Sequence, residues 1–246
     1  MKNKTAIIIV NAVTMIRVIG TLLLPFICWY LSPSGLIIYI AFLLLTDTLD
    51  GFLARQLSAC TIFGSLLDQG ADKLLGIATL AVLAQEYPIM MLPIITETLI
   101  VLITLRRAMR GGLAESTTLG KIKTIVLGIA IVIAFCTVFA SEIILLFDHS
   151  TKLGSELINY FTYMRDNNVM IMSSLAFISV GAGIMVACDY GLRARTEVKQ
   201  AKESGLKPED FKIKRGKALM KALFDTDYYQ KTKKDPLIKK IGSVVK

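Results

Sequence analysis

About six apolar stretches, each of roughly twenty residues, follow one another along this chain and restrict its fold more than any other feature. An α-helix needs about 20 apolar residues to cross the hydrocarbon core of a bilayer. The composition agrees, because 54% of the residues are hydrophobic and the mean hydropathy is +0.61. A soluble domain of this size is less apolar. We therefore predict an all-α, polytopic membrane protein with about six transmembrane helices.

The distribution of lysine and arginine predicts how these helices are oriented. We expect spans near residues 6–31, 36–55, 61–85, 88–105, 119–147 and 169–188, with an external loop between the last two. Cationic residues gather at the N-terminus, at the turn after Arg55, between positions 106 and 123, and in the tail, all on one side. By the positive-inside rule, both termini and a site on that side face the cytoplasm. The prediction is a multi-pass protein of the cell (inner) membrane.

The C-terminal segment differs from the rest of the chain in its charge. Residues 193–246 hold 16 Lys and Arg against 7 Asp and Glu, which accounts for the whole formal net charge of +9. We divide the chain into a transmembrane domain, residues 1–193, and a basic cytoplasmic tail, residues 194–246. A basic segment beside a membrane suits anionic lipid headgroups. No motif or aromatic interleaving favours nucleic acid as its partner.

The chain offers few residues for other kinds of chemistry. The four cysteines are scattered without C-x-x-C spacing, which argues against a disulfide framework or a zinc site. The single histidine, His149, falls in a predicted loop. Catalysis by histidine is therefore not expected.

Four aspartates interrupt the second and third apolar stretches. Asp47 and Asp50 are three residues apart, and Asp68 and Asp72 are four apart, so each pair shares one face of a helix. The short connection between the two stretches predicts antiparallel neighbours with both pairs at matched depth. Clustered carboxylates in a low dielectric repel one another unless a cation neutralises them. We predict a site for one or two divalent cations, Mg²⁺ or Mn²⁺; the alternative is carboxylates on solvated helix faces.

These aspartates belong to a longer pattern. The segment Asp47-x2-Asp50-Gly51-x2-Ala54-Arg55-x8-Gly64-x3-Asp68-x3-Asp72 resembles the signature of the CDP-alcohol phosphotransferase (phosphatidyltransferase) family at every fixed position. The resemblance implies an enzyme that transfers a phosphatidyl group from CDP-diacylglycerol to an alcohol and releases CMP. It implies that all four aspartates ligate metal and that Asp72 is also the general base. It further implies a CDP-binding pocket made of Asp50, Gly51, Ala54, Arg55 and Gly64.

Within the family, the closest resemblance is to bacterial phosphatidylglycerophosphate synthases, which use glycerol 3-phosphate as the acceptor. It rests on Asn11-x2-Thr14-x2-Arg17, on Ala71-Asp72-Lys73 and on Gly120-Lys121-Ile122-Lys123-Thr124. The implied ligands of the acceptor phosphate are Lys121, Lys123, Arg106, Arg107 and Arg17. For the lysines and the arginine pair, the alternative is that they only set topology. For Arg17, the alternative is a snorkelling side chain on an interfacial helix.

Two departures from the family pattern keep other acceptors open. Gln69-Gly70 stands where a Pro-containing pair is usual, and the expected Ala-Arg-Glu segment is absent from the fourth span. Serine or an inositol phosphate therefore remains a possible acceptor. Outside this chemistry, a cation-coupled transporter would also keep intramembrane carboxylates, and a catalytically silent membrane organiser is the third alternative.

The expected partners are CDP-diacylglycerol, glycerol 3-phosphate, membrane lipids and a second copy of the chain in a homodimer. No role is predicted for Glu97 or Glu142.

Overall fold

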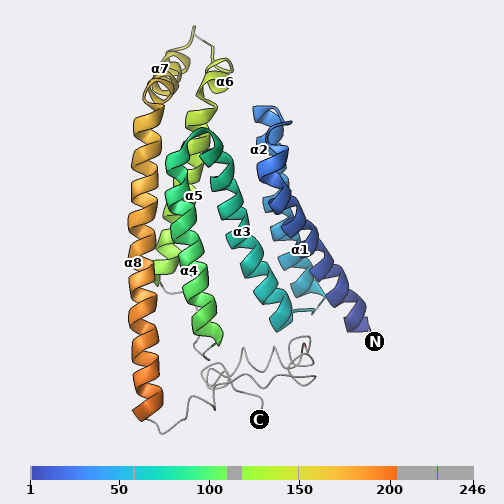
Figure 1. Ribbon diagram of the computed structural model, residues 1–246. Helices are drawn as coiled ribbons and strands as arrows, with labels where there is room; N and C mark the ends of the chain where they lie inside the picture. The colour runs from blue at the N-terminus through green and yellow to red at the C-terminus, as the bar shows by residue number, and fades with distance from the viewer. Residues whose placement is uncertain (1, 58, 110–117, 149, 204–225, 227–246) are drawn as a thin grey trace.

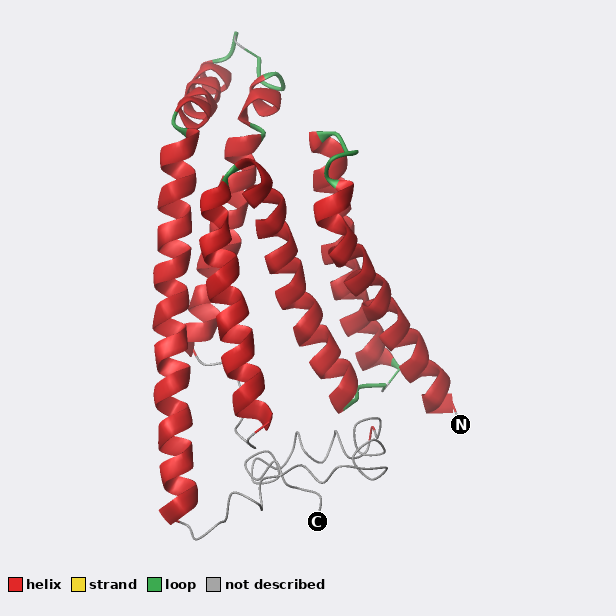
Figure 2. Ribbon diagram, in the orientation of Figure 1, coloured by secondary structure: helices red, strands yellow, loops and turns green. Residues whose placement is uncertain are grey.

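The computed structural model describes residues 2–57, 59–109, 118–148, 150–203 and 226. In this part of the chain every regular element is helical, which confirms the all-α part of the predicted fold class (Figure 2). The elements in order are α1 (Lys2–Ile27), α2 (Pro33–Gln56), α3 (Ile62–Glu86), the 3₁₀ helix η1 (Pro88–Met90), α4 (Met91–Met109), α5 (Thr118–Val138), α6 (Ala140–Ile144), α7 (Lys152–Asp166) and α8 (Asn168–Glu203).

The long helices α1, α2, α3, α4, α5 and α8 correspond to the predicted spans. Four of them contain segments long and apolar enough to cross a membrane, namely Thr5–Ile27, Pro33–Ala54, Thr118–Val138 and Asn168–Arg193. Figure 1 shows the N-terminus, the α2–α3 connection and the C-terminal end of α8 at one end of the molecule. The helices α6 and α7 lie at the opposite end.

A short turn sets where α3 begins and therefore how its aspartates are placed. Thr61 has an extended backbone (φ −130°, ψ 161°), and its hydroxyl accepts a hydrogen bond from the Gly64 N–H at 3.0 Å. This N-cap satisfies one of the free amide groups of the first helical turn. The preceding helix, α2, begins at Pro33. The first position of a helix needs no N–H donor, so the missing N–H of proline costs nothing there.

The first helix lies between the second and the third. In the described residues, α1 packs along both α2 and α3, whereas α2 and α3 make few direct backbone contacts. This differs from the prediction that the second and third spans are antiparallel neighbours, because α1 packs against both of them. A Cβ atom at Gly64 would lie 3.1 Å from Asn11 Oδ1 and 3.2 Å from Thr61 Oγ1. The missing side chain therefore lets α1 approach α3.

The other half of the bundle is built on α4, α5 and α8. A buried apolar cluster joins α3, η1, α5 and α8 through Leu80, Leu83, Met90, Leu127, Ala134, Met172 and Ala176. α4 packs closely along α8. A Cβ atom at Gly183 would lie 3.1 Å from Thr96 Oγ1, whereas one at Gly181 would meet nothing within 4 Å. Of these two glycines, only Gly183 is needed for the close approach.

The segment predicted as an external loop contains a helix, so that part of the prediction was wrong. The 15 residues of α7 begin after Thr151, whose hydroxyl accepts a hydrogen bond from the Gly154 N–H at 3.0 Å. One face of α7 packs inward, with Met164 buried and the Phe161 ring stacked on Phe147 at 6.0 Å between centroids. The fifth span is also shorter than expected, because α5 ends at Val138 and α6 follows after Phe139.

The last helix is longer than a membrane crossing requires. α8 has 36 residues, against about 20 for a span. It passes position 193 without a break, so the predicted boundary there marks a change in composition rather than in secondary structure. Most of the basic tail, residues 204–225 and 227–246, lies outside the described residues.

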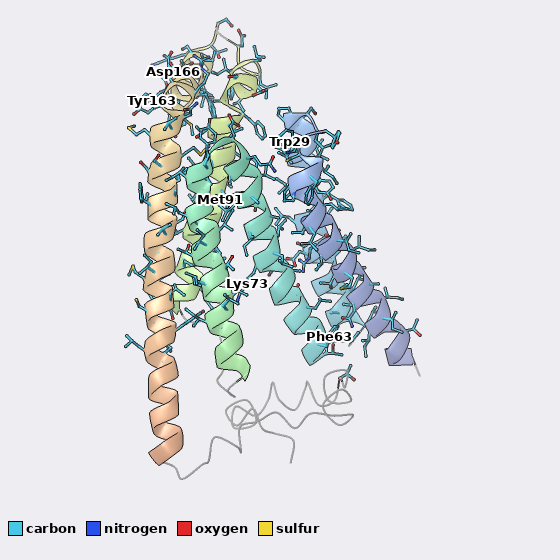
Figure 3. All side chains as sticks on the ribbon, viewed as in Figure 1. Trp29, Phe63, Lys73, Met91, Tyr163 and Asp166 are labelled. Carbon is cyan, nitrogen blue, oxygen red and sulfur yellow. The ribbon has the colours of Figure 1, made fainter. Side chains whose placement is uncertain are left out.

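Aromatic side chains are exposed at the end of the bundle that carries α7. Trp29 is 77% exposed and Tyr30 is 90% exposed, and Tyr160 and Tyr163 of α7 are exposed as well. Figure 3 shows Trp29 and Tyr163 at this end, Phe63 near the opposite end and Lys73 between them. Tryptophan and tyrosine are enriched at membrane–water interfaces. Their position supports an interface at this end of the helices.

Candidate active site

Three of the four predicted metal ligands converge. Asp47 comes from α2, and Asp68 and Asp72 come from successive turns of α3. Each carboxylate offers one oxygen, and these oxygens lie within 4.8 Å of one another. The fourth aspartate, Asp50, is one turn beyond Asp47 on α2, and its side chain lies outside the described part of the structure.

A buried arginine from α1 binds this carboxylate cluster, which we define as Asp47, Asp68 and Asp72. Arg17 is 0% exposed. Its Nη2 donates to Asp68 Oδ1 at 2.8 Å, and its Nη1 donates to Asp72 Oδ1 at 3.3 Å and to Asp47 Oδ1. The guanidinium places its charge-assisted donors on carboxylates from two other helices. Complete burial excludes the alternative in which Arg17 snorkels to the membrane surface.

The donor set of the cluster fits a divalent cation. Carboxylate oxygens are the ligands that Mg²⁺ and Mn²⁺ prefer. Arg17 contacts all three aspartates, and the side chains of Asp47 and Asp68 are still 37% and 45% exposed. These carboxylates would hold a divalent cation beside the guanidinium of Arg17.

The residues predicted to bind CDP continue along the same two helices. Gly51 and Ala54 follow Asp47 on α2 and are partly buried, and Gly64 precedes Asp68 by one turn of α3. Arg55 lies on α2, but its side chain is outside the described residues. The structure thus places the backbone of the predicted pocket beside the carboxylate cluster.

A large cavity opens from the carboxylate cluster between α2, α3 and α5. Its volume is about 1230 Å³. One end is polar and contains Asp47, Asp72, Lys73, Glu97 and Lys123. The remainder is lined by apolar side chains, such as Ile37 and Leu44 of α2 and Leu127 and Phe135 of α5, and it extends to Ile143. A ligand with a charged head and long apolar chains matches this division.

The cationic residues predicted to bind the acceptor phosphate differ in burial and in their position relative to the cavity. Lys123 is 8% exposed and lines the cavity, and both oxygens of Glu97 accept hydrogen bonds from its Nζ at 2.6 Å. Lys121 is exposed and is not among the residues that line the cavity. Two positions on a helix differ by about 200° around the axis, so the two lysines have different surroundings. The side chains of Arg106 and Arg107 lie outside the described residues.

Three residues of this site were assigned another role or none from the sequence. Arg17 was expected at the acceptor phosphate, and its guanidinium contacts the three aspartates of the carboxylate cluster. Lys73 lines the cavity. It directly follows Asp72 of the sequence motif, and this position could have marked it as a site residue. Glu97 is a lone carboxylate in an apolar span, and the cost of such a charge predicts a partner. The sequence does not show that this partner is Lys123.

Comparison with known proteins agrees with these features. Residues 7–153 match the profile of the CDP-alcohol phosphatidyltransferase family. A CDP-diacylglycerol–glycerol-3-phosphate 3-phosphatidyltransferase of Pseudomonas fluorescens is 40% identical over 83 residues, which cover 31% of this chain and 41% of that protein. Proteins of the same description from Yersinia enterocolitica and Salmonella choleraesuis are each 30% identical, over 46% of this chain and 70% of their own length.

No solved structure matches the chain. The family profile covers more than half of the sequence, including most of α1 and all of α2 to α5, and therefore Arg17, the carboxylate cluster and the polar end of the cavity. This family match favours an enzyme over the other two functions considered from the sequence, a cation-coupled transporter and a catalytically silent membrane organiser. The chain belongs to the CDP-alcohol phosphatidyltransferase family.

Proposed function

We propose that this protein transfers the phosphatidyl group of CDP-diacylglycerol to glycerol 3-phosphate. The acceptor hydroxyl oxygen forms a bond to the phosphorus that carries diacylglycerol, and the bond from that phosphorus to the bridging oxygen breaks. CMP leaves with that oxygen, and the hydroxyl proton passes to a base. The products are phosphatidylglycerophosphate and CMP.

The observation that carries this proposal is the position of the carboxylate cluster at the polar end of the cavity. Asp47 and Asp72 belong both to the cluster and to the cavity wall. A pyrophosphate placed at this end meets the cluster, while acyl chains extend along the apolar walls of α2 and α5. The volume of about 1230 Å³ is above the usual range of about 300–1,000 Å³ for small-molecule pockets, as a lipid requires.

The aspartates have two tasks in this proposal. Asp47, Asp50, Asp68 and Asp72 hold two divalent ions, Mg²⁺ or Mn²⁺, which when bound neutralise the pyrophosphate and lower the pKa of the acceptor hydroxyl. Asp72 accepts the proton of that hydroxyl. Arg17 fixes the carboxylates from α2 and α3 relative to each other, and Gly51, Ala54, Arg55 and Gly64 form the nucleotide pocket.

Cations at the polar end of the cavity support an anionic acceptor. Lys73 and Lys123 both line this end, and the phosphate of glycerol 3-phosphate accepts charge-assisted hydrogen bonds from ammonium groups. The names of the relatives in Pseudomonas, Yersinia and Salmonella include the same acceptor. Lys121, Arg106 and Arg107 remain proposed contributors to the phosphate site.

The proposal includes the placement of the protein. Six spans cross the cell (inner) membrane, with both termini and the active site on the cytoplasmic side. Residues 194–246 form a basic tail that acts at the membrane surface, and the chain works as a homodimer. The orientation is proposed from the distribution of lysine and arginine, and the exposed aromatic residues at the end away from the N-terminus support a membrane interface there (Figures 1 and 3).

The test is CMP release by the purified protein, with CDP-diacylglycerol and a panel of acceptors in the presence of Mg²⁺. We expect release with glycerol 3-phosphate and formation of a phosphatidylglycerophosphate. Release with serine or an inositol phosphate alone would leave the reaction type intact and overturn the acceptor. A correctly folded protein that releases no CMP with any acceptor overturns the reaction. Cross-linking in native membranes tests the homodimer.

A further inference from the structure

Outside the carboxylate cluster, the ion pair with the shortest N–O distance in the described part of the protein joins Lys123 to Glu97. Glu97 lies on α4 and Lys123 lies on α5, 26 residues apart in sequence. Both residues are 8% exposed. The Nζ atom of Lys123 is 2.6 Å from each of the two carboxylate oxygens of Glu97.

This pair lies in the wall of the cavity rather than behind it. Glu97 and Lys123 line the cavity together with Asp72 and Lys73. A lysine ammonium has three N–H donors, and two hydrogen bonds join it to Glu97. One donor remains for a ligand in the cavity.

We propose that Glu97 is a positioning residue, which fixes the Lys123 ammonium at the cavity wall and presents its third donor to the anionic group of the acceptor. This inference rests on the proposed function for the identity of that acceptor. Its physical basis is the flexibility of lysine, whose four-carbon side chain carries a mobile point charge. Contact with both oxygens of one carboxylate restricts that charge to one place.

Charge balance explains why a carboxylate is suited to this task. A buried ammonium without a carboxylate beside it is an uncompensated charge in a low dielectric. Glu97 supplies the compensating charge next to Lys123. Exchange of Glu97 for the acceptor phosphate is disfavoured, because it would leave a buried carboxylate without its partner. Lys123 therefore binds the acceptor with Glu97 still in place.

The alternative is that the pair only joins α4 to α5. Kinetics of Glu97→Gln distinguish the two, with Glu142→Gln as the matched control, since Glu142 is exposed on α6. A positioning role predicts an acceptor KM raised by about tenfold or more, the scale of one charge-assisted hydrogen bond. The KM for CDP-diacylglycerol then changes less than about twofold, and Glu142→Gln changes neither.

The double variant Glu97→Gln with Lys123→Met tests whether Glu97 acts through Lys123. In the Lys123→Met background, Glu97→Gln should change the acceptor KM by less than about twofold, because the residue that it positions is gone. An equal effect of Glu97→Gln in both backgrounds overturns the inference. So does a Glu97→Gln variant that raises both KM values together.

Stability and phosphate binding give readouts that do not depend on turnover. Glu97→Leu with Lys123→Met replaces the pair by apolar groups of similar size and is expected to keep the fold, but to lose binding of glycerol 3-phosphate in calorimetry without CDP-diacylglycerol. Unchanged binding by this folded variant overturns the inference. If the wild-type protein binds glycerol 3-phosphate through Glu97 and Lys123 but releases no CMP, the positioning role stands and the proposed reaction fails.

Discussion

The guanidinium of Arg17 lies 2.8 Å from the carboxylate of Asp68, although 51 residues separate them in the sequence. Arg17 is fully buried on α1, and Asp68 lies on α3. Because α1 runs between α2 and α3, one arginine reaches aspartates of both helices. The carboxylate cluster therefore includes a cationic side chain of the same chain.

Loss of this internal cation should destabilise the metal-free protein. Arg17→Met leaves three clustered carboxylates without a counter-ion, and we expect a loss of about 1–3 kcal/mol, less than for a fully buried pair because the carboxylates are partly exposed. Added Mg²⁺ should raise the Tm of this variant more than that of the wild type, since the metal then supplies the missing charge. Thermal unfolding with and without Mg²⁺ measures both effects.

A matched control is Arg165→Met, which removes an exposed arginine whose Nε is 3.0 Å from Asp166 Oδ1. Exposed ion pairs contribute about 0–1 kcal/mol, so this variant should unfold close to the wild type. An Arg17→Met protein as stable as the wild type in a chelator would contradict the counter-ion role.

Asp68→Asn should abolish catalysis while the fold is kept. The change removes one ligand and one charge from the carboxylate cluster but preserves the shape of the side chain, and the oxygen of the new amide can still accept a hydrogen bond from Arg17. We expect CMP release to fall by at least about a hundredfold, as for other groups that stabilise charge in a transition state. Asp166→Asn on the surface of α7 is the control. Near wild-type turnover by folded Asp68→Asn would remove the metal-site interpretation.

Removal of divalent metal should stop the reaction reversibly. The oxygen-only donor set of the cluster favours Mg²⁺ or Mn²⁺ over softer ions. CMP release should therefore vanish in EDTA and return with excess Mg²⁺ or Mn²⁺. Full activity in a preparation shown by elemental analysis to be metal-free would exclude this chemistry.

Two glycines of α8 should respond differently to the same substitution. Gly183→Val places a branched side chain where a Cβ alone would be 3.1 Å from Thr96 Oγ1, so α4 and α8 must separate. We expect a loss of about 1–3 kcal/mol from overpacking. Gly181→Val adds the same atoms where a Cβ would meet nothing within 4 Å, and should be tolerated. Equal Tm values for the two variants would refute this packing.

The single tryptophan reports on the position of the membrane. Trp29 is the only tryptophan in the chain and is 77% exposed at the α1–α2 turn. If this turn lies at an interface, lipids brominated near the headgroup should quench its fluorescence more than lipids brominated near the chain terminus. Trp29→Phe supplies the background signal. Stronger quenching from the chain terminus would place the turn inside the bilayer.

The sequence was most informative where function is encoded locally. Asp68 and Asp72 are one helical turn apart, so their shared face follows from helix geometry alone. Their approach to Asp47 followed from a short connection between two apolar segments. The all-helical fold also followed from the apolar stretches, because a lipid environment permits few other spanning structures.

Relationships between distant segments were not accessible in this way. The contact of Arg17 with Asp47 depends on α1 packing between α2 and α3, and no periodicity predicts which helix occupies the middle. The pairing of Glu97 with Lys123 similarly depends on how α4 and α5 are rotated. For α7 a signal was present, since Leu157, Phe161 and Met164 recur at helical spacing. The mixed charge of the segment concealed it.

The placement of Arg17 on the first helix has a consequence for how the protein is made. Arg17, Asp47, Asp68 and Asp72 all lie within the first 72 residues, whereas Lys123 is synthesised about 50 residues later. At about 5–20 residues per second, that interval is roughly 3–10 s. The ribosome thus delivers the three carboxylates together with their arginine, and Arg17 offsets one of the three negative charges before the far wall of the cavity exists. An intermediate with three helices therefore enters the membrane with a smaller net charge than the aspartates alone would carry.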